Sequence, residues 1–285
     1  MMRVLKFVVL LLLAIAAVGP FIWLLITALR GASEPVFAWP PTFVPAAPTL
    51  GNFVSVWQQA PMGLYLLNSA AMAAIAVGLN LLLSVLAGYP LARMQFKGSR
   101  WVSGFIVLTM LVPFQVLLIP LYLQFQQLGL AGEPAGLLGR VLPAQLGAWL
   151  GMALPIAVSG FGMLMVRQKL LSVPLSLEES AVLDGCNSWQ VLMHIHLPQL
   201  KATLTVLAVF TFMAAWGELL WPSVLVGNSR FYPLAVGLVQ LQGLFSANWR
   251  LIAVGTILSM VPVLVVFLMA QKQFMAGSLS GAVKE

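Results

Sequence analysis

The segment from Arg167 to Lys201 reads RQKLLSVPLSLEESAVLDGCNSWQVLMHIHLPQLK, and it decides how the rest of the chain is interpreted. It holds three of the seven acidic residues of the protein and lies between two long apolar stretches. A connection of about 35 residues without structure of its own is uncommon in a compact protein. We therefore expect this segment to be folded.

The first half of the segment predicts a short helix. Ser176 and Glu179 fit a capping box of the form S-x-x-E, so the helix starts at Leu177. Its first turn carries acidic side chains, which suit the positive end of the helix dipole. Asp184 and Gly185 then end the helix, because glycine adopts the left-handed cap conformation at little cost.

The second half of the segment predicts another short helix. Ser188 caps it, it runs through His194, and Leu197-Pro198 ends it, because the residue before a proline disfavours the helical conformation. The two helices form an elbow at the glycine corner, a shape suited to docking a partner. A helix pair that only rests on a lipid surface is the alternative.

The composition of the whole chain is that of a membrane protein. The 285 residues are 61% hydrophobic and only 7% charged, with a mean hydropathy of +1.01. A soluble domain has roughly a quarter of its residues charged, and so few charges could not cover a globule of this size. A soluble enzyme, a nucleic-acid-binding domain and a disordered protein are excluded. The single cysteine, Cys186, excludes an intrachain disulfide.

Apolar runs long enough to cross a bilayer recur along the chain. The predicted spans are about 7–29, 64–92, 102–123, 141–165, 202–220 and 251–270. A cleaved signal peptide is the alternative for the first run, but its apolar stretch exceeds the roughly 7–15 residues of such peptides. We predict an all-α, polytopic membrane protein with six transmembrane helices. Residues 1–285 form one transmembrane domain, and residues 167–201 form its cytoplasmic two-helix loop.

The basic residues fix the predicted orientation. One side of the six-span arrangement holds ten of the fourteen and the other side holds four. The ten are Arg3, Lys6, Arg93, Lys97, Arg100, Arg167, Lys169, Lys201, Lys272 and Lys284, and the four are Arg30, Arg140, Arg230 and Arg250. Cytoplasmic loops carry the excess of Lys and Arg. Both termini and the 167–201 loop are therefore expected in the cytoplasm.

The sequence lacks the common catalytic and nucleotide-binding patterns. It has no GxxxxGK[ST] motif, so it cannot hold a P-loop nucleotide by itself. His194 and His196 form an H-x-H pair without the further ligands that a metal site needs. No catalytic set is visible, and we expect no cofactor, no metal and no enzymatic activity in this chain.

Glu218, flanked by Trp216 and Trp221, is the acidic residue predicted near the end of a span. Such an acid can be structural or part of a gate, can contact a solute, or can carry a proton. The two tryptophans are candidates for an interfacial belt or for the lining of a sugar pathway. These three residues are the candidate pathway residues.

The 167–201 loop resembles the EAA loop of ATP-binding cassette (ABC) importer permeases. The resemblance rests on Glu179-Ser180-Ala181, Asp184-Gly185 and Ile195-His196-Leu197-Pro198, at the spacing of that family. Ser180 departs from the usual alanine, and Cys186 stands where another small residue is usual. The coupling residues that the resemblance implies are Glu179, Ser180, Ala181, Asp184, Gly185, Ile195, Leu197 and Pro198.

Further stretches resemble the carbohydrate-uptake, maltose-type group of these permeases. They are Asn68-Ser69, Ala87-Gly88-Tyr89 with Arg93, Pro113 with Ile119-Pro120-Leu121-Tyr122, and Trp216-Gly217-Glu218 with Trp221-Pro222. Gly217 departs from the asparagine of that group, which puts a polar role of this position in doubt.

The resemblance implies a permease subunit that forms half of the pathway for a sugar or related polar solute. A second permease subunit completes the pore, two ATPase subunits hold ATP and Mg, and an extracytoplasmic solute-binding protein delivers the solute at the inner (plasma) membrane of a prokaryote. Glu179 would face a basic group of the ATPase, and Ala181 would pack in its cleft. Asp184 would stabilise the elbow, and Gly185 would allow its turn.

Two alternatives to this interpretation stay open. An ABC importer permease for a non-sugar solute would share the same loop. A secondary transporter would need an internal repeat and intramembrane ion ligands, and the sequence shows neither. The connection from about Pro222 to Asn248 is a candidate for contact with the binding protein.

Overall fold

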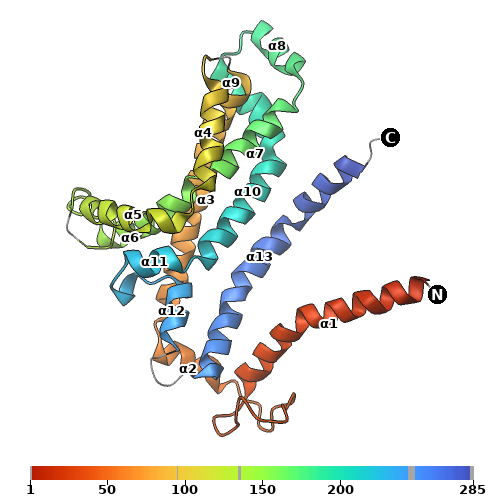
Figure 1. Cartoon of the computed structure of the whole chain (residues 1–285), viewed down its shortest axis with the longest axis vertical. Helices are drawn as coiled ribbons and strands as arrows, with labels where there is room; N and C mark the ends of the chain where they lie inside the picture. Colours follow the sequence, from red (N-terminus) through yellow and green to blue (C-terminus); the bar gives the residue numbers. More distant parts are fainter. Residues whose placement is uncertain (1, 95, 134–135, 243–247, 283–285) are drawn as a thin grey trace.

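The computed structural model describes residues 2–94, 96–133, 136–242 and 248–282, and the described part is built of helices and loops. The longest helices are α1 (Met2–Leu29), α3 (Met62–Arg93), α10 (Leu197–Gly217) and α13 (Trp249–Ala282). The α3 and α10 helices run along the long axis of the molecule, whereas α1 and α13 diverge from them (Figure 1). The described residues contain four helices that are long and apolar enough to span a membrane. The number of candidate spans rises to six if each of two bent helix pairs is counted as one span.

The two bent pairs correspond to the third and fourth predicted spans. The first pair joins α4 (Ser99–Leu111) to α5 (Phe114–Leu128) at an angle of 95°. The second joins α6 (Ala144–Ala157) to α7 (Gly160–Leu171) at 52°. The sequence predicted continuous runs of 102–123 and 141–165, and the structure corrects both to broken ones.

Each break has a local cause. Pro113 precedes α5 in an extended conformation and has no N–H to continue the hydrogen bonding of α4. Ser159 lies in an extended conformation between α6 and α7, and its Oγ accepts the N–H of Gly162. The carbonyl of Ala157 receives the side-chain amide of Asn80 from α3 at 3.0 Å, so the second break is satisfied inside the bundle.

Short elements connect the long ones at both ends of the molecule. They are α2 (Gly51–Gln59), α8 (Leu175–Leu183), α9 (Ser188–Val191), the π-helical turn η1 (Leu192–His196), α11 (Leu220–Leu225), the 3₁₀ turn η2 (Ser229–Phe231) and α12 (Leu234–Gln240). The α8 and α9 helices lie at one end of the long axis and α2 lies at the other (Figure 1). We refer to these as the α8 end and the α2 end.

The buried apolar residues form two clusters of unequal size. The larger cluster joins α3, α6, α10, α11 and α13 and includes Met72, Met152 and Trp221. The smaller cluster lies toward the α8 end, where Val166 and Leu170 of α7 pack against Leu200 of α10 and the last turns of α3. The α1 helix takes almost no part in either, because its side chains are exposed along nearly all of its length.

Candidate functional site

The glycine corner predicted in the loop is present. Gly185 has a φ of +86°, the left-handed conformation, directly after Asp184 caps the end of α8. The N–H of Gly185 donates to the carbonyl of Val182, and the N–H of Cys186 donates to that of Ala181, each at 3.0 Å. This pair of bonds is a Schellman motif, which satisfies the last carbonyls of a helix. The corner is therefore fixed by main-chain hydrogen bonds.

The start of α8 differs from the prediction. The helix begins at Leu175, directly after Pro174, and no side chain caps it. Ser176 lies inside the first turn, so the predicted capping box is wrong. The helix thus starts two residues earlier than the S-x-x-E pattern predicts, after the extended backbone of Pro174.

The second helix of the elbow also differs. Asn187, and not Ser188, is its N-cap: the Asn187 side chain accepts the N–H of Gln190, and the Gln190 side chain accepts the N–H of Asn187, each at 2.9 Å. This is a capping box with amide side chains.

Leu197-Pro198 does not end this helix. The chain continues from α9 through the π-helical turn η1 into α10 as one candidate span, Ser188–Gly217. Pro198 lies in the first turn of α10, where a missing N–H leaves no helical bond broken. The wider η1 turn shifts the hydrogen-bond register just before it. The elbow is therefore one short helix followed by the beginning of a membrane helix.

The predicted coupling residues divide between two sides of the elbow. Ala181 is buried, and Ile195 and Leu197 are half-buried. The exposed coupling residues are Glu179, Ser180, Asp184, Gly185 and Pro198. Ala181 shares a face of α8 with Glu178, three residues away, and its expected packing in a cleft of a partner stays a prediction. Glu179 and Leu183, one turn apart, are both exposed, and Leu183 is 87% exposed.

The inner side of α8 faces a group of ionisable side chains that the sequence did not predict. Glu178 Oε2 lies 3.5 Å from Arg93 Nε and 3.4 Å from His196 Nε2. The side chains of Arg93 and His196 are 5% and 0% exposed, and that of Glu178 is 22% exposed. We call these three residues the α8 junction. A hollow of about 450 Å³ beside them is lined by Arg93, Leu175, Glu178, Glu179, Val182 and Leu183.

The histidines do not form a metal site. His194 is exposed, with Nδ1 3.0 Å from the carbonyl of Gln190, whereas His196 is buried. Within the described residues, no three His, Cys, Asp or Glu side chains converge as metal ligands would.

The candidate pathway residues lie at the break between α10 and α11. Glu218 follows the last turn of α10, and its Oε1 accepts the N–H of Trp221 at 3.0 Å. The indole N–H of Trp216 donates to Ser259 of α13, and that of Trp221 donates to Gly151 of α6, each at 2.9 Å. Both rings are buried, so they pack inside the bundle and do not form an interfacial belt.

The loop after α11 is held by a buried amide near the start of α3. Asn68 donates to the carbonyls of Arg230 and Tyr232, each at 3.0 Å. Its Oδ1 accepts Gln145 Nε2 at 2.6 Å and Trp149 Nε1 at 3.0 Å. All four hydrogen-bonding positions of the amide are thereby used. We call this group the Asn68 junction.

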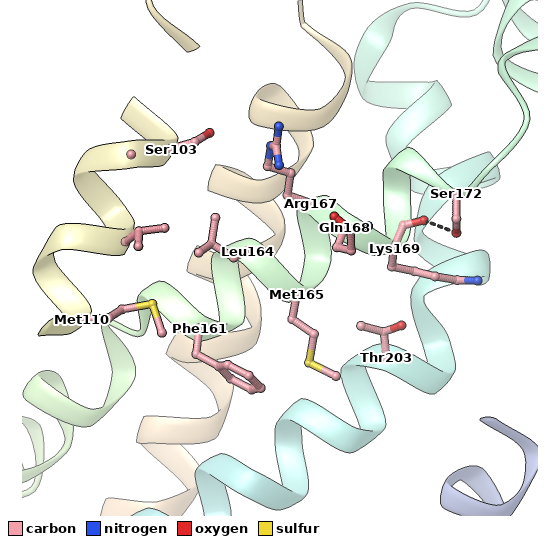
Figure 2. A pocket seen from close by; sticks show the side chains of 12 residues that line it. Ser103, Met110, Phe161, Leu164, Met165, Arg167, Gln168, Lys169, Ser172 and Thr203 are labelled. Atoms are coloured by element: carbon pink, nitrogen blue, oxygen red, sulfur yellow. Dashed lines mark hydrogen bonds between the residues drawn. The ribbon is translucent and has the colours of Figure 1, made fainter. Parts of the chain in front are cut away.

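Two apolar grooves mark surfaces of the bundle. One, of about 840 Å³, lies between α4 and α7 and extends to Thr203, with Arg167 and Lys169 at its end (Figure 2). The other, of about 880 Å³, separates α13 from α3 and α10 and has Thr205 and Trp216 in its lining. Neither groove offers the set of converging polar groups that recognition of a polar solute requires.

A helical bundle with candidate membrane spans and a rigid amphipathic corner at one end is the framework of a transport permease. Residues 80–275 match the family model described as "Binding-protein-dependent transport system inner membrane component". The chain belongs to this family. It is therefore a multi-pass inner-membrane permease subunit of an ABC importer, not itself an enzyme. The transport systems of this family depend on a binding protein. The secondary-transporter alternative is thereby excluded.

The chain is similar over nearly its whole length to permeases that are named for sugars. The lactose transport system permease protein LacG of Rhizobium radiobacter is 30% identical, with 99% of this chain and 96% of that protein covered. The diacetylchitobiose uptake system permease protein DasC of Streptomyces coelicolor is 31% identical, with 95% and 94% covered.

The fold is shared with a solved ABC transporter. A chain of a bacterial transporter involved in the import of alginate superposes with a TM-score of 0.78 at 21% identity, with 95% of each chain covered. A chain of the MetNI methionine transporter superposes with a TM-score of 0.55 at 19% identity, covering 76% of this chain and 97% of that one.

Proposed function

We propose that this chain forms half of the translocation pathway for a sugar or a related polar solute, with a second permease subunit as the other half. Relatives along its length are named for lactose, arabinooligosaccharides and diacetylchitobiose. Two ATPase subunits would supply the energy, because the sequence has no P-loop of its own. An extracytoplasmic binding protein would deliver the solute.

The observation that carries the proposal is the rigid α8 corner. Gly185 fixes the end of α8, while Glu179 and Leu183 stand exposed on its outer side. A short helix held at a fixed angle, with one acid beside apolar side chains, is a surface that an ATPase subunit with a basic group can bind. We assign α8 and its corner as the coupling loop, with Glu179 as its contact to the ATPase.

The proposed topology has six spans, each bent pair counting as one, with both termini in the cytoplasm. The α8 end contains Arg93, Lys97, Arg100, Lys169 and Lys201, close to where their helices end or begin. Such an excess is typical of the cytoplasmic side. Lys284, also predicted on this side, lies outside the described residues.

Trp216, Glu218 and Trp221 have a positioning role in this proposal. The indole groups hold the end of α10 to α13 and α11 to α6, and Glu218 accepts the N–H of Trp221. These residues thus shape the pathway and do not present these polar atoms to a solute. The turn around Arg230, which the Asn68 junction holds, is our proposed contact with the binding protein.

The coupling assignment is tested with Glu179→Lys in the complete importer. We expect the variant to insert and to accumulate in the membrane as the unsubstituted chain does, because Glu179 is exposed and has no contact within the described chain that the charge reversal would break. Solute-stimulated ATP hydrolysis should fall about tenfold or more, as for a one-sided break of a charged contact. Normal stimulation in this variant would contradict the assignment.

The solute class is tested in the same preparation. The importer, purified with its ATPase and binding protein, is assayed for stimulated ATP hydrolysis with lactose, arabinooligosaccharides and diacetylchitobiose, and with methionine as a non-sugar probe. Stimulation by a sugar supports the proposed class. Stimulation by methionine alone would overturn the sugar assignment and leave the importer role intact.

A further inference from the structure

The α8 helix has few links to the rest of the molecule. Of its nine residues, only Ala181 is buried and only Glu178 is half-buried, while all the others are exposed. The helix stands beyond the ends of the long helices (Figure 1). Any force that a partner applies to α8 must therefore pass through its two chain connections, the small Ala181 side chain, or Glu178.

Glu178 connects α8 with two different long helices. A single oxygen, Oε2, faces both Arg93 Nε at 3.5 Å and His196 Nε2 at 3.4 Å. Arg93 is the last residue of α3, and His196 is the last residue of the η1 turn that leads into α10. Within the described residues, Glu178 is the one α8 side chain that forms an ion pair with another element.

Arg93 extends this link to the chain on the near side of α8. Its Nη2 donates to the carbonyls of Leu170 and Val173, each at 2.6 Å. These carbonyls belong to the end of α7 and to the turn that leads into α8. One guanidinium thus holds α3 to both the entry and the inner face of the coupling helix.

Tyr89, one turn before Arg93 on α3, contacts the other side of the elbow. Its hydroxyl donates to the carbonyl of Ser188 at 3.3 Å, and its ring centre lies 5.4 Å from that of His196. Because residues four apart share a helix face, the last turn of α3 presents Tyr89 and Arg93 together to the loop.

The ionisable side chains of the α8 junction are close but not tightly bonded to one another. Arg93 Nε, Glu178 Oε2 and both ring nitrogens of His196 are buried and make no hydrogen bond of good geometry within the described part. Removing one partner of such a group leaves a desolvated charge and is costly. Small displacements of the Glu178 carboxylate relative to Arg93 and His196, in contrast, break no aligned hydrogen bond. The junction can hold α8 while its angle to the bundle changes.

We propose that Glu178 is a positioning residue of the coupling step, which passes movement of α8 to α3 through Arg93 and to α10 through His196. This inference rests on the proposed function, in which α8 meets an ATPase subunit. It assigns different tasks to two adjacent acidic residues. Glu179 faces outward and binds the partner, and Glu178 faces inward and links the bound helix to the bundle.

The test separates docking from coupling in the complete importer. Docking is measured as the cross-linking yield between a cysteine at Leu183→Cys and the ATPase, in a Cys186→Ser background. Coupling is measured as the factor by which saturating binding protein of the same importer stimulates ATP hydrolysis. We expect Glu178→Gln to keep the cross-linking yield and to lower the stimulation factor about fivefold or more.

Two further variants make the test specific. The matched control is Glu179→Gln, one residue away, which should lower the cross-linking yield itself. Combining Glu178→Gln with His196→Gln should cause little more loss than Glu178→Gln alone, because both substitutions break the same link. A general loosening of the fold would instead lower the docking yield and make the losses add.

The outcomes are distinct for the inference and for the proposed function. The positioning role is overturned if Glu178→Gln keeps the stimulation factor of the unsubstituted importer. It is also overturned if this variant loses both the cross-linking yield and the stimulation. In either case the ATPase contact stands. The chain that carries Leu183→Cys and Cys186→Ser but keeps Glu178 and Glu179 must cross-link to the ATPase. If it does not, the proposed function of α8 is wrong and the inference fails with it.

Discussion

The two ends of α3 are held by different chemistry. Near its start, Asn68 is a neutral amide with all four hydrogen-bonding positions occupied, at 2.6 to 3.0 Å. At its end, Arg93 Nη2 bonds to the end of α7 and to the turn before α8, but Arg93 Nε faces Glu178 Oε2 at 3.5 Å without an aligned hydrogen bond. A fully satisfied buried network defines one arrangement, whereas an ionic contact of loose geometry tolerates several. The same helix is thus fixed at the α2 end and adjustable at the α8 end.

This difference matches the demands on the two ends in an importer. The Asn68 junction holds the turn near Arg230 in one position, which a binding protein can recognise without reordering it. The α8 junction lies where energy from an ATPase is expected to enter, and there a movable contact is useful. In rocking mechanisms, rigid bodies move about a few such adjustable contacts.

The largest predicted effect breaks the fixed end. Asn68→Leu keeps a side chain of similar size but leaves two carbonyls and the N–H donors of Gln145 and Trp149 without their partner. We expect a loss of about 3 kcal/mol of stability, because each unpaired buried group costs about 1 kcal/mol or more. Thermal unfolding of the purified permease in detergent measures it. A melting temperature equal to that of the unsubstituted chain would contradict the fixed character of this end.

A smaller effect is expected where α3 meets α7. A methyl group added at Gly88 would lie 2.8 Å from Val166 Cγ1 and 2.9 Å from the carbonyl of Met163, closer than such atoms pack. Gly88→Ala should therefore force α7 away and cost about 2 kcal/mol. It should also weaken the α8 junction, because Arg93 bonds to the end of α7.

Gly78→Ala is the matched control for this packing prediction. Gly78 lies on the same helix, and an added methyl group there meets nothing within 4 Å. Alanine favours the helix over glycine by up to about 1 kcal/mol, so this variant should be neutral or slightly more stable. Equal losses in both variants would contradict the approach of α7 as the cause of the Gly88→Ala effect.

The smallest effect concerns pH at the α2 end. The pKa of Glu34 is lowered, and the largest cause is the hydrogen bond from the N–H of Ala47. The hydrogen bonds from Ala46 and Gly31 and the charge of Arg30 lower this pKa further, whereas burial opposes them. The folded pKa therefore lies below the unfolded value. The stabilisation of the 31–47 turn is present above about pH 4.3 and is lost as the pH falls through the lowered pKa.

Hydrogen exchange at the amides of Ala46 and Ala47 measures this loss. Their protection should fall as the pH drops below about 4 in the unsubstituted chain. In Glu34→Gln it should already be lower at neutral pH and should show no such step. A step of the same size in Glu34→Gln would assign the pH dependence to another group.

Much of the fold was predictable from local patterns. The apolar runs located the membrane helices, because the length of an apolar run is a local property. Gly185 marked the corner, because the left-handed conformation there favours glycine over other residues. Glu218 was predicted near a span end and lies at the end of α10.

Other features could not be inferred from such patterns. Hydropathy reports that residues 102–123 are apolar, but not that the chain turns by 95° at Pro113. Leu197-Pro198 read as a stop, yet the π-helical turn before it lets the helix continue. Asn187 with Gln190 replaced the predicted Ser188 cap, because several nearby polar side chains can compete for the same N–H groups.

The α8 junction was the principal functional feature that sequence reasoning missed. Arg93, near the end of a predicted span, and Glu178, in the loop, were both noted, but they are 85 positions apart and nothing local pairs them. The available signal was weak: two adjacent acids in a chain with only seven. Only the packing of α3 against α7 shows that Glu178 faces inward.

By itself, the sequence determined that this protein is a helical membrane protein with a glycine corner in its 167–201 loop, because apolar length and a glycine turn act over short distances. The tertiary structure decided which acid faces the bundle, where two spans break, and how the ends of α3 are held. Those outcomes depend on which distant groups meet when helices pack, and the pairing of buried polar atoms is settled only then.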